Sequence, residues 1–390
     1  MNNVCESDVP LSTDISTSTD GLVCPVTRQR LRRVSLQEAR AHIAGGRALQ
    51  VRAAAPGAAV TGETDPVLLR EDAQAAYPIV AGIPVLLAPE VLCAPGVAAR
   101  FDLAAPQYAE AYLEMEFYNA SGYREADALR KAGSLLAVAS SESLQHLERL
   151  RQRSGVFRDS FPQPYDVWLH ARMDLQSQWD CYSHIGSVKG QRVLQLGGSG
   201  HVLLVFLLAG AAEGLLLTPM LGEAEAAIAA AKILGVADRF RCLVAVAEEI
   251  PLASEYVDAA FSGGCVHHMR TEVAFPEIAR VLRPGGRFAA IEPWRAPLYG
   301  VGTRLLGKRE PNAFCRPITR ARVAPLFAAF REARYELHGT FTRYAMLGLQ
   351  KFGVFTPLRR AWWVGRTDDR VCSVLGLRRF GSGVALLATK

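Results

Sequence analysis

Residues 192–200 read Arg-Val-Leu-Gln-Leu-Gly-Gly-Ser-Gly, an apolar strand that runs directly into a turn with three glycines. An apolar helix is expected after this turn, followed by a second apolar strand over 214–217. Glycines let backbone amides approach a ligand closely, and the N-terminus of a helix favours negative charge. The stretch therefore predicts the first strand–turn–helix unit of a parallel sheet, with a ligand site at the turn.

The alternation of strands and helices continues toward the C-terminus. Helices are expected over 223–234 and 271–282, the second ending before Pro284-Gly285-Gly286. Further strands are expected over 241–246, 257–262 and 287–292, with two late strands over 335–344 and 383–389 and the last one inserted antiparallel. This pattern is typical of an α/β fold with a mostly parallel, Rossmann-like sheet and helices on both faces.

Shifts in composition divide the chain into four segments. Residues 1–20 are rich in Ser, Thr, Asp and Asn and are predicted to be a disordered tail. Residues 21–92 are predicted to form a small α+β module, because prolines and glycines interrupt short apolar runs. Residues 93–187 show apolar side chains at helical spacing and are predicted to form a helical cap. Residues 188–390 hold the strand–helix alternation and a C-terminal extension.

Composition argues against several classes of protein. Half of the residues are hydrophobic and 21% are charged, so the chain can bury a large core. The net charge of +6 is mild, whereas nucleic-acid binders concentrate basic residues in a stripe. The longest apolar run, 202–212, is shorter than the roughly 20 residues of a membrane span. Eight cysteines without a Cys-x-x-Cys pair favour a reducing compartment. We therefore expect a cytoplasmic protein with neither a membrane nor a nucleic acid as partner.

Several motifs follow the glycine turn at characteristic separations. They are Ala247-Glu248-Glu249-Ile250-Pro251-Leu252, Tyr256-Val257-Asp258, Val266-His267-His268-Met269 and Leu282-Arg283-Pro284-Gly285-Gly286-Arg287. In this order the sequence closely resembles the class I S-adenosylmethionine-dependent methyltransferases, most of all the branch with ubiquinone and menaquinone biosynthesis enzymes and many natural-product methyltransferases. The resemblance covers about 191–294 and is expected to continue to residue 390.

The resemblance implies a fold, a cofactor and a reaction. It implies a class I methyltransferase sheet with a helical cap, S-adenosylmethionine as the cofactor, and methyl transfer to a small-molecule substrate such as a natural product or metabolite. A homodimer is left open as the oligomeric state. The residues that the family would use to hold the cofactor correspond to Gln195, Gly197, Gly198, Ser199, Gly200, Thr218, Ala247, Glu248 and Gly264.

The departures from the family predict a degenerate cofactor site. Three positions that are acidic in the family are neutral here: Gln195, Leu216 and Val246. A carboxylate suits the second position because it can accept hydrogen bonds from both ribose hydroxyls. Either Thr218 or Glu223 could take its place. The losses leave two rivals to methyl transfer: a non-methylating enzyme on this fold (a cyclase, isomerase, lyase or metal-assisted catalyst), or a non-catalytic scaffold partner.

Catalytic candidates follow the fourth and fifth strands of the sheet. His267 or His268 could act as a general base near neutral pH, and Glu292 stands where the family often places a polar substrate contact. A transition-metal site made by His201, Cys265, His267 and Glu292 is the rival reading of the same residues. The prediction that we retain has no metal, with His267, His268 and Glu292 as the catalytic set.

The N-terminal module resembles a second family. The segments Leu22-Val23-Cys24-Pro25 and 77–87 are similar to the zinc-ribbon-like activator subunit of RNA and protein methyltransferases. Thr27 stands where a second cysteine would follow Cys24, so the zinc ligands are lost and no metal is expected. The run 77–87 is too apolar to stay exposed, so the module is predicted to pack against the sheet domain.

Overall fold

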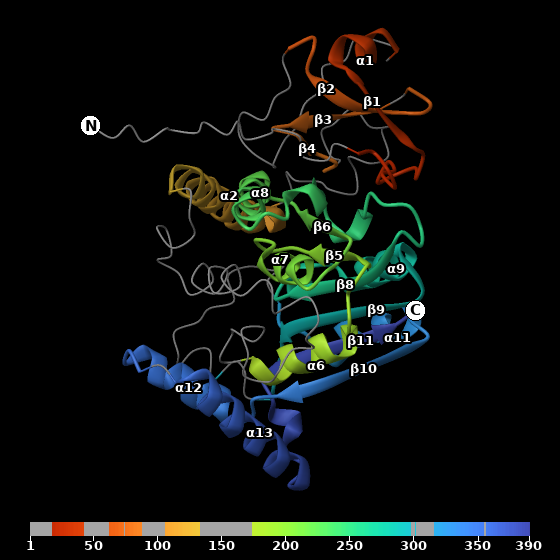
Figure 1. Cartoon of the computed structure of the whole chain (residues 1–390). Coiled ribbons are helices and arrows are strands. Elements are labelled where there is room, and N and C mark those ends of the chain that lie inside the picture. The colour runs from red at the N-terminus through yellow and green to blue at the C-terminus, as the bar shows by residue number, and fades with distance from the viewer. Residues whose placement is uncertain are drawn as a thin grey trace, which may run out of the picture.

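The computed structural model describes residues 18–42, 62–73, 75–87, 106–132, 174–297, 301, 316–354 and 356–390. A small N-terminal module lies at one end of the molecule, the main sheet lies in the middle, and the last two long helices lie at the opposite end (Figure 1).

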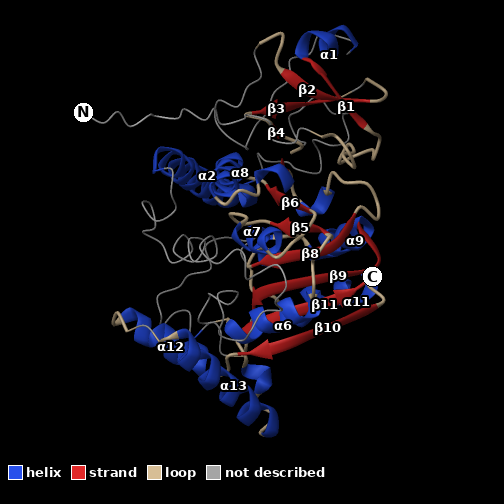
Figure 2. Cartoon of the chain, viewed as in Figure 1, coloured by secondary structure: helices blue, strands red, loops and turns tan. Residues whose placement is uncertain are grey.

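The main sheet confirms the predicted α/β class. It has seven strands in the order β10-β11-β9-β8-β5-β6-β7, and β11 alone runs antiparallel to both of its neighbours. The strand order reverses between β5 and β8, and open α/β sheets commonly bind ligands at the carboxyl ends of the strands at such a point. Figure 2 shows the strands as one twisted layer. Their bounds are β5 (Arg192–Leu196), β6 (Glu213–Thr218), β7 (Phe240–Val244), β8 (Val257–Gly263), β9 (Leu282–Pro293), β10 (Glu332–His338) and β11 (Gly383–Thr389).

Each face of the sheet has its own hydrophobic core. In β5, Val193 packs into the core beneath α6 (Leu175–Ile185), α7 (His201–Leu208) and α8 (Leu221–Ile233). Its neighbours Leu194 and Leu196 pack into the core beneath α9 (Thr271–Val281) and α11 (Arg320–Ala329). The side chains of a strand alternate between faces, so an apolar strand can serve both cores.

Helix α2 (Pro106–Ala132) belongs to the predicted cap and packs closely on α8. The two backbones meet at glycines: a Cβ atom on Gly122 would lie 2.4 Å from the backbone of Gly222. The side chain of Asn119 accepts a hydrogen bond from the amide of Gly222 at 2.6 Å, so α2 satisfies a backbone donor in the first turn of α8. The remainder of the predicted cap, apart from α6, lies outside the described residues.

The N-terminal module forms an antiparallel sheet beside the main one. Its elements are β1 (Leu31–Ser35), α1 (Leu36–His42), β2 (Pro66–Arg70), β3 (Ala76–Val80) and β4 (Ile83–Pro84). Beyond β4, Val85 pairs with Val244 of β7 in a parallel bridge, and the amide of Leu86 donates to the carbonyl of Val244 at 2.7 Å. The module thus covers the β7 edge of the main sheet, which confirms the predicted packing.

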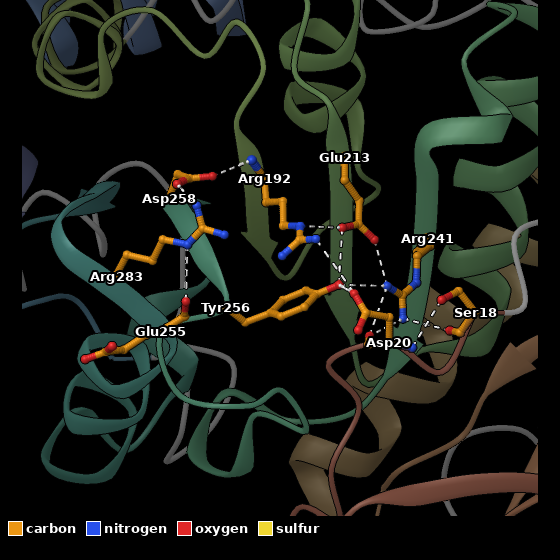
Figure 3. Close-up of polar contacts among 9 residues, drawn as sticks. All are labelled: Ser18, Asp20, Arg192, Glu213, Arg241, Glu255, Tyr256, Asp258 and Arg283. Atoms are coloured by element: carbon orange, nitrogen blue, oxygen red, sulfur yellow. Dashed lines mark hydrogen bonds and ion pairs between the residues drawn. The ribbon is translucent and has the colours of Figure 1, made fainter.

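A polar network attaches the start of this module to the amino-terminal edge of the sheet (Figure 3). Arg241 donates to the Glu213 carboxylate at 2.7 Å and to the Ser18 carbonyl at 2.9 Å. The Tyr256 hydroxyl donates to Asp20 at 3.1 Å. Residues 18–20 are therefore bound to the sheet, although the sequence predicted a loose tail up to residue 20; the rest of that tail lies outside the described residues.

The predicted strand over 335–344 is wrong in its second half. Strand β10 ends at His338, and Gly339 follows with a φ of 68°, a left-handed conformation that glycine adopts without strain. The chain then turns into α12 (Thr342–Lys351), which is followed by α13 (Leu358–Val374). Within the described ranges, no helix combines the length and the apolar character that crossing a membrane requires.

Candidate functional site

The glycine turn follows β5 and depends on left-handed backbone conformations. The φ angles of Gly197, Gly198 and Gly200 are 72°, 73° and 76°. A Cβ atom on Gly197 would lie 2.6 Å from the Cys265 sulfur, so the turn and the segment after β8 touch through this glycine. By contrast, a Cβ atom on Gly198 would have no neighbour closer than 3.7 Å. Gly198 and Ser199 are half-buried, so they form the open part of the turn.

Gln195, in β5, supports the glycine turn through hydrogen bonds of its side-chain amide. Its side-chain amide donates to the Gly197 carbonyl at 2.9 Å, and its side-chain oxygen accepts from the Leu203 amide at 2.7 Å. Leu203 lies in the first turn of α7, where backbone amides lack partners within the helix. Gln195 is only 4% exposed. Gln195, which the sequence predicted as a cofactor contact, therefore shapes the glycine turn and pairs with a backbone amide at the start of α7. Its side-chain nitrogen donates and its side-chain oxygen accepts, so both groups are in use.

A carboxylate lies at the carboxyl end of β6. The Thr218 hydroxyl donates to Glu223 at 3.0 Å, and burial raises the pKa of Glu223 although this hydrogen bond opposes the shift. Leu216, the apolar residue at one of the family's acidic positions, is fully buried, with its side chain against Gly200. Of the two substitutes expected from the sequence, Glu223 thus carries the charge and Thr218 orients it.

The loop after β7 contains Glu248, an acidic residue predicted from the sequence to hold the cofactor. Ala247 is buried in a short 3-10 turn, and Glu248 accepts a hydrogen bond from the Arg270 amide at 2.7 Å. Burial raises the pKa of the Glu248 carboxyl group. Because Arg270 precedes the first residue of α9, Glu248 ties this loop to the start of that helix.

Glu292 anchors the 3-10 turn Val266–His268 that follows β8. Its side chain is 0% exposed. It accepts hydrogen bonds from the amides of Cys265 at 3.0 Å, Val266 at 2.7 Å and His267 at 3.3 Å. Gly264, just before this turn, has a φ of 79° and donates its amide to Ile291 at 2.8 Å. Glu292 is therefore a positioning residue that holds the turn, rather than a group exposed to a substrate.

The same carboxylate distinguishes the two histidines. The Nδ1 atom of His267 lies 2.8 Å from Glu292 Oε2. Because that oxygen already accepts a backbone amide, the hydrogen-bond network assigns the proton to Nδ1 and leaves Nε2 as the basic nitrogen. The ring of His268 lies 4.1 Å from that of His267, centroid to centroid. The sequence left both histidines open as bases, and the geometry favours His267.

Arg322 of α11 binds the backbone carbonyl groups of this turn. Its guanidinium donates to the carbonyls of Val266 at 3.2 Å, His267 at 3.2 Å and Met269 at 2.8 Å. The turn is thus held by an anion at its amides and a cation at its carbonyls, the arrangement that backbone dipoles favour. Arg322 is not among the site residues predicted from the sequence. No local signal identifies it, because its partners lie more than 50 residues earlier.

The proposed metal ligands do not assemble. The Nε2 atom of His201 lies 3.8 Å from Glu125 of α2, while His267 and Glu292 are bound to each other. Cys265 packs on the glycine turn, and burial raises the pKa of its thiol. Throughout the described ranges, no three His, Cys, Asp or Glu side chains are grouped as a metal site. In the N-terminal module, the Cys24 sulfur lies 3.0 Å from the Tyr77 hydroxyl.

Comparisons with known proteins find similarity over part of the chain. A family described as methyltransferase domain matches residues 197–290. Uncharacterized methyltransferases of Mycobacterium bovis and Mycobacterium tuberculosis are 47% identical over 49 residues, which are 13% of this chain and 20% of each relative. The chain thus spans about a fifth of the length of these curated relatives.

Solved structures with a similar arrangement include two enzymes. Geranyl diphosphate C-methyltransferase from Streptomyces coelicolor A3(2) is 16% identical, with 55% of this chain and 76% of that chain covered and a TM-score of 0.40. The [4+2]-cyclase SpnF is 20% identical, with 64% and 94% covered and a TM-score of 0.41. The family match begins at residue 197, so it does not reach residues 21–92, and it does not specify a branch of the methyltransferases. The likeness of residues 21–92 to an activator subunit therefore stays a prediction, as does the resemblance to the quinone-biosynthesis branch. Residues 197–290, which match the methyltransferase domain family, run from the glycine turn after β5 into β9 of the seven-stranded sheet.

Proposed function

We propose that the protein transfers a methyl group from S-adenosylmethionine to a small-molecule nucleophile, with His267 as the general base. The observation that carries this proposal is the hydrogen bond between His267 Nδ1 and the buried Glu292, beside a glycine turn of the type that holds this cofactor. The contact between Gly197 and Cys265 brings the turn and the histidine segment to one edge of the sheet.

The residues at the strand ends fit this cofactor in part. Gly198 and Ser199 offer an open backbone surface for its amino-acid end, and Glu223 offers a carboxylate for its ribose hydroxyls. Ala247 and Glu248 lie in the loop that would meet its adenine ring. Gln195 does not fit a direct contact, because both ends of its amide are already used. This supports a cofactor site with fewer charged contacts than the family has.

S-adenosylmethionine would supply an electrophilic methyl group on a sulfonium, which departs as a neutral thioether. The protein's own part is to orient the acceptor, exclude water and remove one proton. His267 Nε2 would take the proton from the acceptor's O–H, N–H or C–H group as the new bond to carbon forms. Glu292 would stabilise the resulting imidazolium through Nδ1.

One observation favours a second candidate, a non-methylating reaction on the same fold. Leu216 fills one acidic position of the family with an apolar, fully buried side chain. A protein that no longer consumes the cofactor would tolerate such a loss. The base formed by His267 and Glu292 would serve an isomerase, cyclase or lyase equally well, because each needs a positioned proton acceptor.

The experiment supplies the protein with S-adenosylmethionine labelled in its methyl group and with a small-molecule extract of cells. Mass spectrometry should find the label in a low-molecular-weight product with the wild type, and not with the His267→Ala variant. Unlabelled new products that depend on His267 would favour the non-methylating reaction. Label in macromolecules alone would contradict the small-molecule acceptor.

A further inference from the structure

Helix α13 exposes an unusual combination of side chains on one face. We call this the α13 outer face and define it by Arg360, Trp363, Val364, Arg370, Val371 and Val374, which recur at helical spacing. Trp363 is 55% exposed and Val374 is 88% exposed. Helices in globular proteins normally turn such apolar side chains inward, so this face is built to meet an apolar environment.

The opposite side of α13 explains why the helix holds its orientation. Ala361, Trp362 and Cys372 are buried. The ring of Trp362 lies 5.7 Å from that of Trp179 on α6, in an edge-to-face arrangement. A Cβ atom on Gly365 would lie 2.3 Å from the side chain of Gln176, so α13 and α6 are in close contact. The exposed face is therefore held rigidly and points away from the sheet.

Basic residues outnumber acidic ones around this face, although Arg343 pairs with Asp174 and Arg378 pairs with Glu336. Residues 341–379 hold eight Lys and Arg residues and two acids, a net charge of +6 that equals the net charge of the whole chain. Both acids bind inward. Asp368 accepts the amides of Phe341 and Thr342 at 3.0 and 3.1 Å, and Asp369 lies 2.7 Å from His338. No acidic side chain is thus left on the outer face of this segment to offset Arg360 and Arg370.

We propose that the α13 outer face binds the surface of an anionic lipid bilayer, with the helix lying in the plane of the interface. Valine and tryptophan side chains would enter the acyl boundary while the arginines meet lipid phosphates. The connection before α13 adds to the apolar surface, since Phe352 is 84% exposed. From overall composition we expected that a membrane is not a partner. The proposal replaces that expectation, because it rests on a local concentration of charge that the overall composition does not reveal.

Two other occupants fit this surface less well. A second copy of the chain in a symmetric dimer would bring like-charged arginines together across the α13 outer face. A nucleic acid would match the arginines but would leave Val364, Val371 and Val374 against phosphates and water. Hydrocarbon beneath a layer of anionic headgroups satisfies both kinds of side chain. The α12–α13 pair also lies at the far end of the molecule from the N-terminal module, where a flat surface can approach it (Figure 1).

The test is sedimentation of the full chain with vesicles of phosphatidylcholine alone or with 30% phosphatidylglycerol, a composition chosen at roughly the anionic content of many membranes. Wild-type protein should partition to the anionic vesicles and remain free of the neutral ones. Each basic residue near such a surface contributes about a fivefold change in partitioning. The Arg360→Glu/Arg370→Glu variant should therefore partition at least roughly 25-fold less, and Trp363→Ser/Val371→Ser roughly tenfold less.

A charge-matched control separates this face from general attraction. Arg33 and Arg331 are exposed arginines on other elements, so Arg33→Glu/Arg331→Glu should partition like the wild type apart from a small effect of net charge. Unchanged melting temperatures in the α13 variants would show that they fold. The proposal is overturned if the control and the α13 variants lose binding equally, if wild type ignores anionic vesicles, or if the α13 substitutions dissociate a dimer or a nucleic-acid complex instead.

Discussion

The Nδ1 atom of His267 lies 2.8 Å from Oε2 of Glu292, and the same carboxylate accepts the backbone amide of His267. The ring and the backbone of one residue are thus fixed by one buried group. This removes the rotational freedom that a general base would otherwise lose on binding its substrate. It also fixes the tautomer, so the neutral ring presents Nε2 as its proton acceptor.

The two neighbouring histidines provide a matched pair of variants. His267→Asn should lower turnover by about 10²–10⁴-fold, because the amide keeps a hydrogen-bonding group at Glu292 but cannot take a proton. His268→Asn, in the same turn, should lower turnover less than roughly tenfold. Rates with the labelled product and melting temperatures of both variants provide the check. Equal losses in both, together with equal falls in melting temperature, would indicate two structural histidines.

Gln195→Glu should destabilise the protein by about 1–3 kcal/mol. A carboxylate can still accept from Leu203, but it cannot donate to the Gly197 carbonyl and would repel that oxygen. Urea unfolding of the purified variant measures the change. A Gln195→Glu protein of unchanged stability with tighter S-adenosylmethionine binding would mean that residue 195 faces the cofactor after all.

The two glycines of the turn should respond differently to alanine. Both have φ near 72°, so each substitution costs about 1 kcal/mol in backbone strain. Gly197→Ala also forces a Cβ against the Cys265 sulfur, which adds roughly 1–3 kcal/mol of overpacking. In Gly198→Ala the new Cβ would make only ordinary van der Waals contacts, at 3.7 Å or more, so this variant should fold nearly normally but obstruct the ligand surface. Unfolding free energies that are equal for the two variants would contradict the contact between Gly197 and Cys265.

A buried histidine in the C-terminal region should make stability depend on pH. Burial alone would lower the pKa of His338, but hydrogen bonds to Asp180 and Asp369 outweigh it and raise the pKa to about 9. In the unfolded chain this pKa is about 6.5. The folded state therefore holds a proton that the unfolded state releases between these values.

The stabilisation from His338 is accordingly complete below about pH 6.5 and is lost as the pH rises through 9, by about 3 kcal/mol in all. Unfolding in urea at pH 6, 7.5 and 9 (values chosen to bracket roughly this window) should show the decline in the wild type. His338→Gln should be less stable at pH 6 and nearly independent of pH across the same range. A wild type that gains stability toward pH 9 would refute the assignment.

Strand positions could be predicted from the sequence where glycine or charge marks both ends of an apolar run. The bounds 383–389 and the strand 192–196 are found as expected for this reason. The strand expected over 335–344 fails because its apolar and aromatic residues continue past Gly339 into α12, and β propensity does not distinguish the two.

Those parts of the candidate site that lie at the ends of strands could be predicted from the sequence. His267 follows β8 and Glu292 lies near the end of the neighbouring parallel strand β9, so their meeting at one edge of the sheet follows from topology. Arg322 and Asn119 could not be predicted, since each reaches its backbone partner from a helix far away in sequence. The role of Gln195 was also missed, because its two hydrogen bonds depend on the exact path of the turn that it supports.

Calorimetric titration with S-adenosylmethionine and S-adenosylhomocysteine tests the central claim most directly. The wild type should bind both ligands at one saturable site. Glu223→Gln should weaken binding by tenfold or more, because a charge-assisted hydrogen bond to ribose is worth about 1.5–3 kcal/mol. Glu225→Gln, two residues further along α8 and paired with Arg130, should bind like the wild type. Absence of binding to either ligand by the folded wild type at roughly millimolar concentration would contradict a methyltransferase function.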